Sequence, residues 1–240
     1  MTPECRRAGI IAAGQGSRLA GSHPGCAKPL VPVAGRPLCH WVAASLREAG
    51  ITDITLLHNS DGCGVRRSLE EAFGDIAWTF LQADTASSWE SFRLVARTIA
   101  QTQAPFLIST VDALVPPAET KRFWDFAATR DAAASLALTA FVDDEKPLWA
   151  QIDDSGRVTA LGEPCSDRRY VTSGLYYLSA ATAQGLPEPR AFPSLRRYLT
   201  ALVDSGALVT GHPLAKTIDV DRPEDVVQAE GFLKEAISSW

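Results

Sequence analysis

The sequence predicts an α/β fold in three layers, α/β/α, with a mixed, mostly parallel sheet in a Rossmann-like arrangement. Two observations support this prediction. Short apolar runs alternate along the chain with segments of helical period, which is the pattern of strands connected by covering helices. The 240 residues, of which 46% are hydrophobic, are enough to bury one large core. We therefore expect a single domain over 1–240, with one half over about 1–112 and the other over about 113–240.

The first half begins with the apolar run Gly9-Ile10-Ile11-Ala12-Ala13, which we interpret as a buried strand. A helix is expected over 37–49, because Leu38, Trp41, Val42 and Leu46 recur at helical spacing before a glycine. The pattern then predicts strands over 54–58, 76–81 and 106–110 and helices over 65–73 and 88–102.

The second half begins with a predicted helix over 119–130 and a predicted strand over 134–141. Shorter β segments follow around 149–152, 158–161 and 171–178, with a turn at 154–156. The apolar residues Val226, Ala229 and Leu233 form the stripe of a final helix.

Composition excludes several classes of protein. The net charge of −5 argues against nucleic acid as a partner. The sequence contains no run of about 18 apolar residues, the length that a membrane span would need. The odd number of cysteines without a C-x-x-C pair predicts neither a disulfide framework nor a zinc site, and fits a reducing, cytoplasmic location. They are Cys5, Cys26, Cys39, Cys63 and Cys165. The sequence carries no signal for an oligomeric state.

A glycine loop, A-A-G-Q-G-S-R-L over 12–19, follows the first strand. Glycines allow the backbone to turn sharply and bring its N–H groups close to an anion, and Arg18 and Lys28 add two cations. A dinucleotide-binding loop would need a glycine where Leu19 stands, and a Walker-type loop would need Lys-Ser/Thr at 22–23, which is Ser-His. These residues predict a triphosphate-binding loop, the alternative being a βα turn with two solvated cations.

With Lys28-Pro29-Leu30 and the G-R-P-L run at 35–38, this loop resembles that of the nucleoside-triphosphate transferase family, the sugar-phosphate nucleotidyltransferases of GT-A-like fold. The resemblance implies a nucleotide-binding first half and an acceptor-binding second half. It also implies that Arg18 and Lys28 are catalytic, on the leaving phosphates and the α-phosphate respectively. The nucleotide would bind at Ala12, Ala13, Gly14, Gln15, Gly16 and Ser17.

Three aspartates are candidate ligands of Mg²⁺. Asp112 follows the strand over 106–110, where a carboxylate could hold a metal or merely form a turn. Asp219 and Asp221 lie in a stretch that resembles the family's closing I-D-x-x-x-P-E-D segment, and as residues two apart on a short strand they would project to the same side. We interpret Asp219 as a ligand, whereas Asp221 is either a ligand or, with Glu224, a capping box for the final helix.

The resemblance also places the base-reading loop, where Gln82, Ser87 and Ser88 are candidates. Ser88 could equally be a helix N-cap, and the nucleobase stays open. The acceptor would bind at Glu163, Thr172, Ser173 and Gly174. The lysine with which the family binds the acceptor phosphate is replaced by Cys165 in this chain. Four other cations could take its place, namely Lys146, Arg168, Arg169 and Lys216.

The predicted function is therefore transfer of a nucleoside monophosphate to a sugar 1-phosphate, with release of pyrophosphate, by an Mg²⁺-dependent enzyme. The alternative is a CTP-dependent cytidylyltransferase acting on an alcohol phosphate such as phosphocholine or a polyol phosphate. A glycosyltransferase of the same fold and a non-catalytic nucleotide-sugar sensor fit the residues less well.

Overall fold

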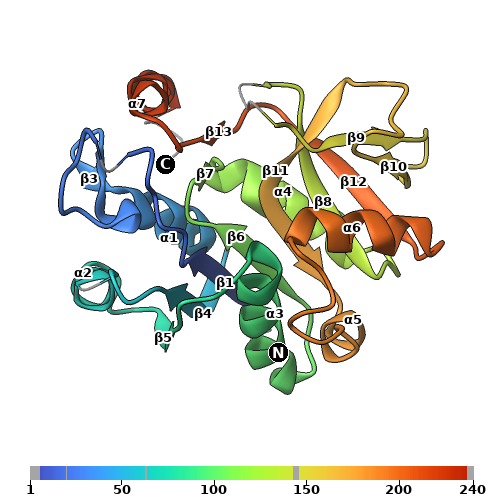
Figure 1. The fold of residues 1–240 in the computed structure, drawn as a ribbon, viewed down its shortest axis with the longest axis horizontal. Helices are drawn as coiled ribbons and strands as arrows, with labels where there is room; N and C mark the ends of the chain where they lie inside the picture. Colours follow the sequence, from blue (N-terminus) through green and yellow to red (C-terminus); the bar gives the residue numbers. More distant parts are fainter. Residues whose placement is uncertain (1–5, 20, 63, 143–145, 237–240) are drawn as a thin grey trace.

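The computed structural model describes residues 6–19, 21–62, 64–142 and 146–236. A nine-stranded sheet runs through the molecule with helices on both sides (Figure 1). Its strands follow the order β10-β9-β11-β6-β1-β4-β5, with β8 beside β11 and β12 beside β8. All of them except β10 and β11 run in the same direction. The expected three-layer fold with a mixed, mostly parallel sheet is confirmed.

The main sheet comprises β1 (Arg6–Ala12), β4 (Ile51–His58), β5 (Ala77–Gln82), β6 (Phe106–Thr110), β8 (Ala134–Thr139), β9 (Trp149–Ile152), β10 (Val158–Leu161), β11 (Tyr170–Leu178) and β12 (Val209–Leu214). The short strands β2 (Pro32–Val33) and β3 (Arg36–Pro37) pair with each other, as do β7 (Ala113–Leu114) and β13 (Ile218–Asp219). The helices are α1 (Leu38–Glu48), α2 (Val65–Ala72), α3 (Ser88–Ile99), α4 (Pro117–Ala128), α5 (Ala180–Gln184), α6 (Leu195–Asp204) and α7 (Pro223–Ala236), with 3₁₀ turns η1 (Lys28–Leu30) and η2 (Ala100–Thr102).

Two hydrophobic clusters lie on opposite faces of this sheet. One contains apolar side chains of α1, α2, α4 and α7, and the other contains those of α3, α5 and α6. Alternate residues of β1 serve the two clusters, since Ile10 belongs to the first and Ile11 packs against the second. A Cβ at Gly9 would overlap Val95, so this glycine allows α3 to pack closely on β1.

The elements predicted from the sequence are present, with ends shifted by a few residues, whereas α5, α6, β12 and the short strands β2, β3 and β7 were not predicted. A signal for α6 was present in the sequence, because Leu195, Tyr198 and Leu199 recur at helical spacing. The N-cap of α3 is Ser87, so the capping prediction at Ser88 is wrong by one residue.

Three cysteines, Cys26, Cys39 and Cys165, are free thiols, and Cys5 and Cys63 lie outside the described residues. Among the helices of the described segments, none combines the length and the apolar character that a membrane crossing requires.

The sheet brings segments that are distant in sequence together at the carboxyl ends of its parallel strands. β1 and β6 are parallel neighbours, so the glycine loop after β1 and the turn after β6 leave the sheet at the same end. Beyond that turn, β7 pairs with β13, and the amide of Val220 donates to the carbonyl of Asp112 over 3.0 Å. The segment at 217–221, distant in sequence, therefore lies beside Asp112.

Candidate functional site

The glycine loop, η1 and the two aspartate segments enclose a cavity of about 320 Å³, which we call the loop cavity. Its described lining consists of Gly14, Gly16, Ser17, Arg18, Lys28, Asp112 and Asp221. Both cations expected to bind phosphate thus share one cavity with two carboxylates. Ala12, the first residue of this loop, is also the buried last residue of β1.

Lys28 lies at the centre of the loop cavity. Its Nζ donates to Asp112 Oδ2 over 2.7 Å and forms a second ion pair with Asp221. Only 7% of its side chain is exposed. Burial opposes the charge, but the two carboxylates outweigh it and raise the pKa of Lys28. Lys28 is therefore a charged lysine throughout the physiological range.

Asp112 has the complementary environment. Burial would raise the pKa of its carboxyl group, yet the ammonium of Lys28 and hydrogen bonds from Lys28 and Thr110 lower it. The carboxylate of Asp112 is thus ionised and already neutralised by a partner. Because the charges in the loop cavity compensate one another, an incoming anion has to compete with carboxylates for Lys28.

Gly16 fixes the approach of the loop to Lys28. Its φ of +60° lies in the left-handed region, which favours glycine. A Cβ at this position would come within 2.6 Å of the Cβ of Lys28. The glycine therefore serves both the turn and the packing of the lysine stem against the loop.

The expected strand through both Asp219 and Asp221 is not formed, and of the two only Asp221 is in the described lining of the loop cavity. The strand β13 ends at Asp219, and the chain then turns into α7. At this turn the carboxylate of Asp225 accepts hydrogen bonds from the amides of Asp221 and Arg222 over 2.9 and 2.8 Å. Asp225 is thus the residue that caps α7, and the side chain of Asp221 is directed toward Lys28 in the loop cavity.

The donor chemistry of the loop cavity fits a hard cation. Asp112 and Asp221 supply carboxylate oxygens on either side of Lys28. Mg²⁺ commonly uses one or two protein carboxylates and completes its shell with water and substrate phosphates. Within the described ranges no group of three or more His, Cys, Asp or Glu side chains is arranged to hold a metal. The residues therefore fit a metal that is shared with a phosphate ligand.

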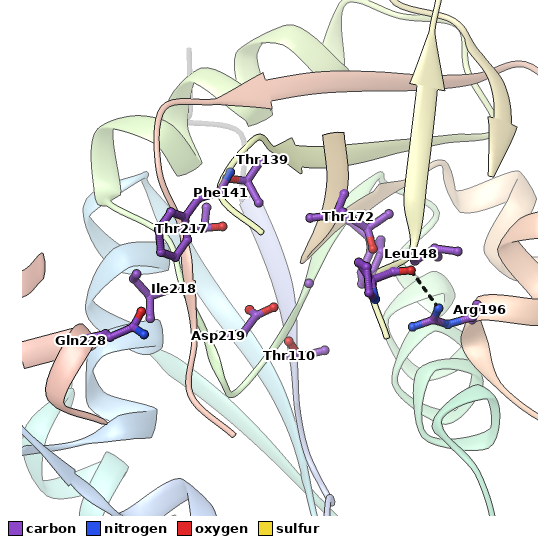
Figure 2. Close-up of a pocket in the computed structure, with 14 residues that line it drawn as sticks. Thr110, Thr139, Phe141, Leu148, Thr172, Arg196, Thr217, Ile218, Asp219 and Gln228 are labelled. Carbon is purple, nitrogen blue, oxygen red and sulfur yellow. Dashed lines mark hydrogen bonds between the residues drawn. The ribbon is translucent and has the colours of Figure 1, made fainter. Parts of the chain in front are cut away.

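A second cavity, of about 190 Å³, has Asp219 in its lining (Figure 2). Because the lining also includes Thr172 and Gly174, two of the residues expected from the sequence to bind an acceptor, we call it the acceptor cavity. Side chains with hydroxyl, amide or charged groups line much of it, namely Thr110, Thr139, Thr172, Tyr176, Arg196, Thr217, Asp219 and Gln228. Burial, together with the nearby charges of Asp219 and Asp112, raises the pKa of Tyr176, so its phenol is neutral.

Of the four predicted acceptor residues, two line the acceptor cavity, whereas Ser173 and Glu163 are not in its described lining. Thr172 and Gly174 line the acceptor cavity. Gly174 has a φ of +74° at a bulge of β11, and a Cβ there would lie 2.5 Å from Thr110 Oγ1, so the glycine also allows close packing. Ser173 is fully buried, and its Oγ finds no hydrogen-bond partner among the described residues.

Glu163 belongs to neither cavity. Its side chain is completely exposed, lies 3.9 Å from a guanidinium nitrogen of Arg168, and borders a third cavity of about 680 Å³. Glu163 is therefore not in one lining with Thr172 and Gly174, although the third cavity shares Pro147, Leu148 and Arg196 with the acceptor cavity.

The candidate base-reading residues lie at the same edge of the sheet as the glycine loop. Gln82 is the exposed last residue of β5. The Oγ of Ser87 accepts from the amide of Glu90 as the cap of α3, and the Oγ of Ser88 accepts from the amide of Leu195 over 3.1 Å. Their part in base recognition stays a prediction.

Sequence reasoning did not identify Thr110, Thr139, Arg196, Thr217 and Gln228 as residues of a site. Thr110 and Thr217 stood next to motifs that were recognised, and Arg196 lies on a helix whose apolar spacing was visible. That these residues share one cavity depends on sheet pairings between distant segments.

A glycine loop with two cations, at the carboxyl end of a parallel strand and opposite two carboxylates, is an arrangement with which α/β proteins bind phosphate-bearing ligands. The family model of the MobA-like NTP transferase domain matches residues 8–206, and the chain belongs to this family.

Individual relatives agree with this assignment. The chain is 28% identical to a glucose-1-phosphate thymidylyltransferase of Streptomyces antibioticus over 82% of this chain and 57% of that protein. It is 41% identical to an N-acetylmuramate alpha-1-phosphate uridylyltransferase of Neisseria meningitidis over 29% of this chain and 28% of the relative. It thus spans less than two thirds of the length of either relative. The inositol-1-phosphate CTP transferase from T. maritima shares the fold, with a TM-score of 0.77 and 20% identity over 96% of this chain and 97% of that one.

Proposed function

We propose that this protein transfers a nucleoside monophosphate from a nucleoside triphosphate to a sugar 1-phosphate, making a nucleoside diphosphate sugar and releasing pyrophosphate. The observation that carries the proposal is the loop cavity, where Lys28 lies between Asp112 and Asp221 beside a glycine loop. The family and the relatives named above support the same class of reaction.

The chemistry is an in-line displacement. An oxygen of the acceptor phosphate attacks the α-phosphorus of the triphosphate, the bond from that phosphorus to the bridging oxygen breaks, and pyrophosphate leaves with the electron pair. The reaction requires no protein nucleophile. The amides of the glycine loop and the guanidinium of Arg18 would hold the β- and γ-phosphates, and Lys28 would hold the α-phosphate as its charge spreads.

Asp112 and Asp221 would hold Mg²⁺. This pair replaces the predicted pair of Asp112 and Asp219, because Asp112 and Asp221 both line the loop cavity. When bound, the metal supplies further neutralisation of the phosphate oxygens. Lys28 would then leave the two carboxylates and bind the α-phosphate. We propose Asp219 as an acceptor residue, because a carboxylate accepts hydrogen bonds from sugar hydroxyls and Asp219 lines the acceptor cavity.

A polyol phosphate is the second candidate acceptor. The hydroxyl and amide groups of the acceptor cavity suit any polyhydroxylated ring, and the T. maritima protein that shares the fold is an inositol-1-phosphate CTP transferase. Phosphocholine fits less well, because quaternary ammonium groups are recognised by aromatic cages, and the described lining holds only Phe141 and Tyr176 as aromatic residues.

The test is a matrix of four nucleoside triphosphates against a panel of phosphates that includes glucose 1-phosphate, inositol 1-phosphate and phosphocholine. The readout is pyrophosphate release with and without Mg²⁺. We expect release that depends on one sugar 1-phosphate and on the metal. If the parent protein releases pyrophosphate with no combination of triphosphate and acceptor, or only hydrolyses the triphosphate, the proposed transfer is wrong.

A further inference from the structure

The acceptor cavity has one cationic side chain in its described lining, that of Arg196. Its one acidic side chain there is Asp219. Figure 2 shows Asp219 and Thr110 near each other and Arg196 well away from both, beside Leu148. The hydroxyl of Thr110 donates to Asp112, so Asp219 and Thr110 mark the end nearest the loop cavity. Arg196 marks the opposite end.

The cations expected from the sequence to bind the acceptor are not part of this lining. Lys146 borders the third cavity, and Arg168 pairs with Glu163. Arg169 pairs with Asp167, and the Nζ of Lys216 lies 4.8 Å from the ring centroid of Phe141.

Arg196 is held in place by its surroundings. It lies in the first turn of α6, whose start is tied to the start of α3 by the hydrogen bond from Leu195 to Ser88. Its guanidinium donates to the carbonyl of Pro147 over 3.2 Å, a bond drawn in Figure 2, and to the carbonyl of Lys146. A guanidinium carries five N–H groups, so donors remain for an anion beyond these two contacts.

We propose that Arg196 binds an oxyanion of the acceptor and is the cation that replaces the family's missing lysine in this chain. The inference rests on the proposed function. Two groups of an acceptor could supply such an oxyanion. One is the phosphate that receives the nucleoside monophosphate, and the other is a carboxylate elsewhere on the sugar. Arginine suits both, because its planar donors match two oxygens of one group.

The experiment compares Arg196→Gln, Arg196→Lys and the control Arg197→Gln with the parent. Arg196 and Arg197 are both exposed and both border the third cavity, but only Arg196 is in the described lining of the acceptor cavity. Binding of glucose 1-phosphate, glucuronic acid 1-phosphate and a non-hydrolysable triphosphate is measured by calorimetry, and thermal melting verifies that each variant is folded. The two sugars differ by one carboxylate.

We expect Arg196→Gln to weaken sugar-phosphate binding by about tenfold or more, as expected for a lost charge-assisted hydrogen bond, and to change triphosphate binding by less than about twofold. Arg196→Lys should restore part of the binding, and Arg197→Gln should resemble the parent. An equal loss for both sugars assigns Arg196 to the transferred phosphate, whereas a loss confined to glucuronic acid 1-phosphate assigns it to the carboxylate.

Equal binding of both sugars to the parent and Arg196→Gln would overturn the inference, as would an equal loss in Arg197→Gln or a parent that binds neither sugar. A parent that releases pyrophosphate while Arg196→Gln binds and reacts normally would refute only the role of Arg196. A parent that binds the sugars through Arg196 but transfers nothing would refute only the proposed reaction.

Discussion

The loop cavity and the acceptor cavity differ in how they handle charge. In the loop cavity, a buried lysine faces two carboxylates and an arginine, so its ions compensate one another before any ligand binds. In the described lining of the acceptor cavity, one carboxylate and one guanidinium stand with several hydroxyl groups and one side-chain amide. The first cavity is suited to a polyanion that displaces internal partners, and the second to a ring recognised through many neutral hydrogen bonds.

The largest effect is expected at Lys28. Lys28→Ala should lower the rate of pyrophosphate release by about 10²- to 10³-fold, by analogy with the loss of one preorganised donor to a developing charge. Lys121→Ala, which removes an exposed lysine that pairs with Asp125, is the control and should retain the parent rate. Steady-state kinetics and a melting curve separate catalysis from unfolding. Normal turnover in Lys28→Ala would remove the loop cavity from the mechanism.

The aspartates test the boundary between the cavities. Asp112→Asn and Asp221→Asn should raise the Mg²⁺ concentration needed for half-maximal rate by about tenfold, because the charge that holds the cation is lost. Asp219→Asn should instead raise the KM of the acceptor. Metal titrations at saturating substrates measure the difference. If Asp219→Asn raises the metal requirement and Asp221→Asn does not, the cavities have been assigned the wrong way round.

The sequence predicted the residues of a cavity where they lie close together along the chain, and missed them where they come from distant segments. The glycine loop and Lys28 lie within a short stretch of the chain, so their spacing alone identified them. The sequence favoured Asp219 over Asp221 as a metal ligand and predicted a strand through both, whereas β13 ends at Asp219 and Asp221 lines the loop cavity. Arg196 joins the acceptor cavity through the packing of α6 against α3 and β10, contacts without a local signal in the sequence.

Gly16→Ala should have an intermediate effect. A Cβ at positive φ costs about 1–2 kcal/mol, and here it would also displace the stem of Lys28. We therefore expect a lower free energy of unfolding together with a reduced rate, measured by urea titration and by pyrophosphate release. Gly21→Ala is the control, since nothing lies within 4 Å of its added Cβ. Equal stabilities of the two variants would contradict the packing role of Gly16.

The smallest effect is a change in the pH dependence of stability. The pKa of Asp112 is lowered in the folded protein, so its contribution to stability is present above the unfolded-state value of about 4 and is lost as the pH falls through the folded value. Asp112→Asn should therefore flatten the acid side of the stability curve. Urea midpoints between about pH 2 and 6 measure it, with exposed Asp131→Asn as control. Parallel curves for the parent and Asp112→Asn would show that the ion pair with Lys28 does not form.

The most direct test of the account is a crystal structure of the protein with Mg²⁺ and a non-hydrolysable triphosphate. We expect the phosphates to contact the loop over 14–18, Lys28 to have moved from its carboxylates to the α-phosphate, and Asp112 and Asp221 to hold the metal, with the acceptor cavity left open. Phosphates bound at Arg196, or an ion pair between Lys28 and Asp112 that persists beside a bound triphosphate, would contradict it.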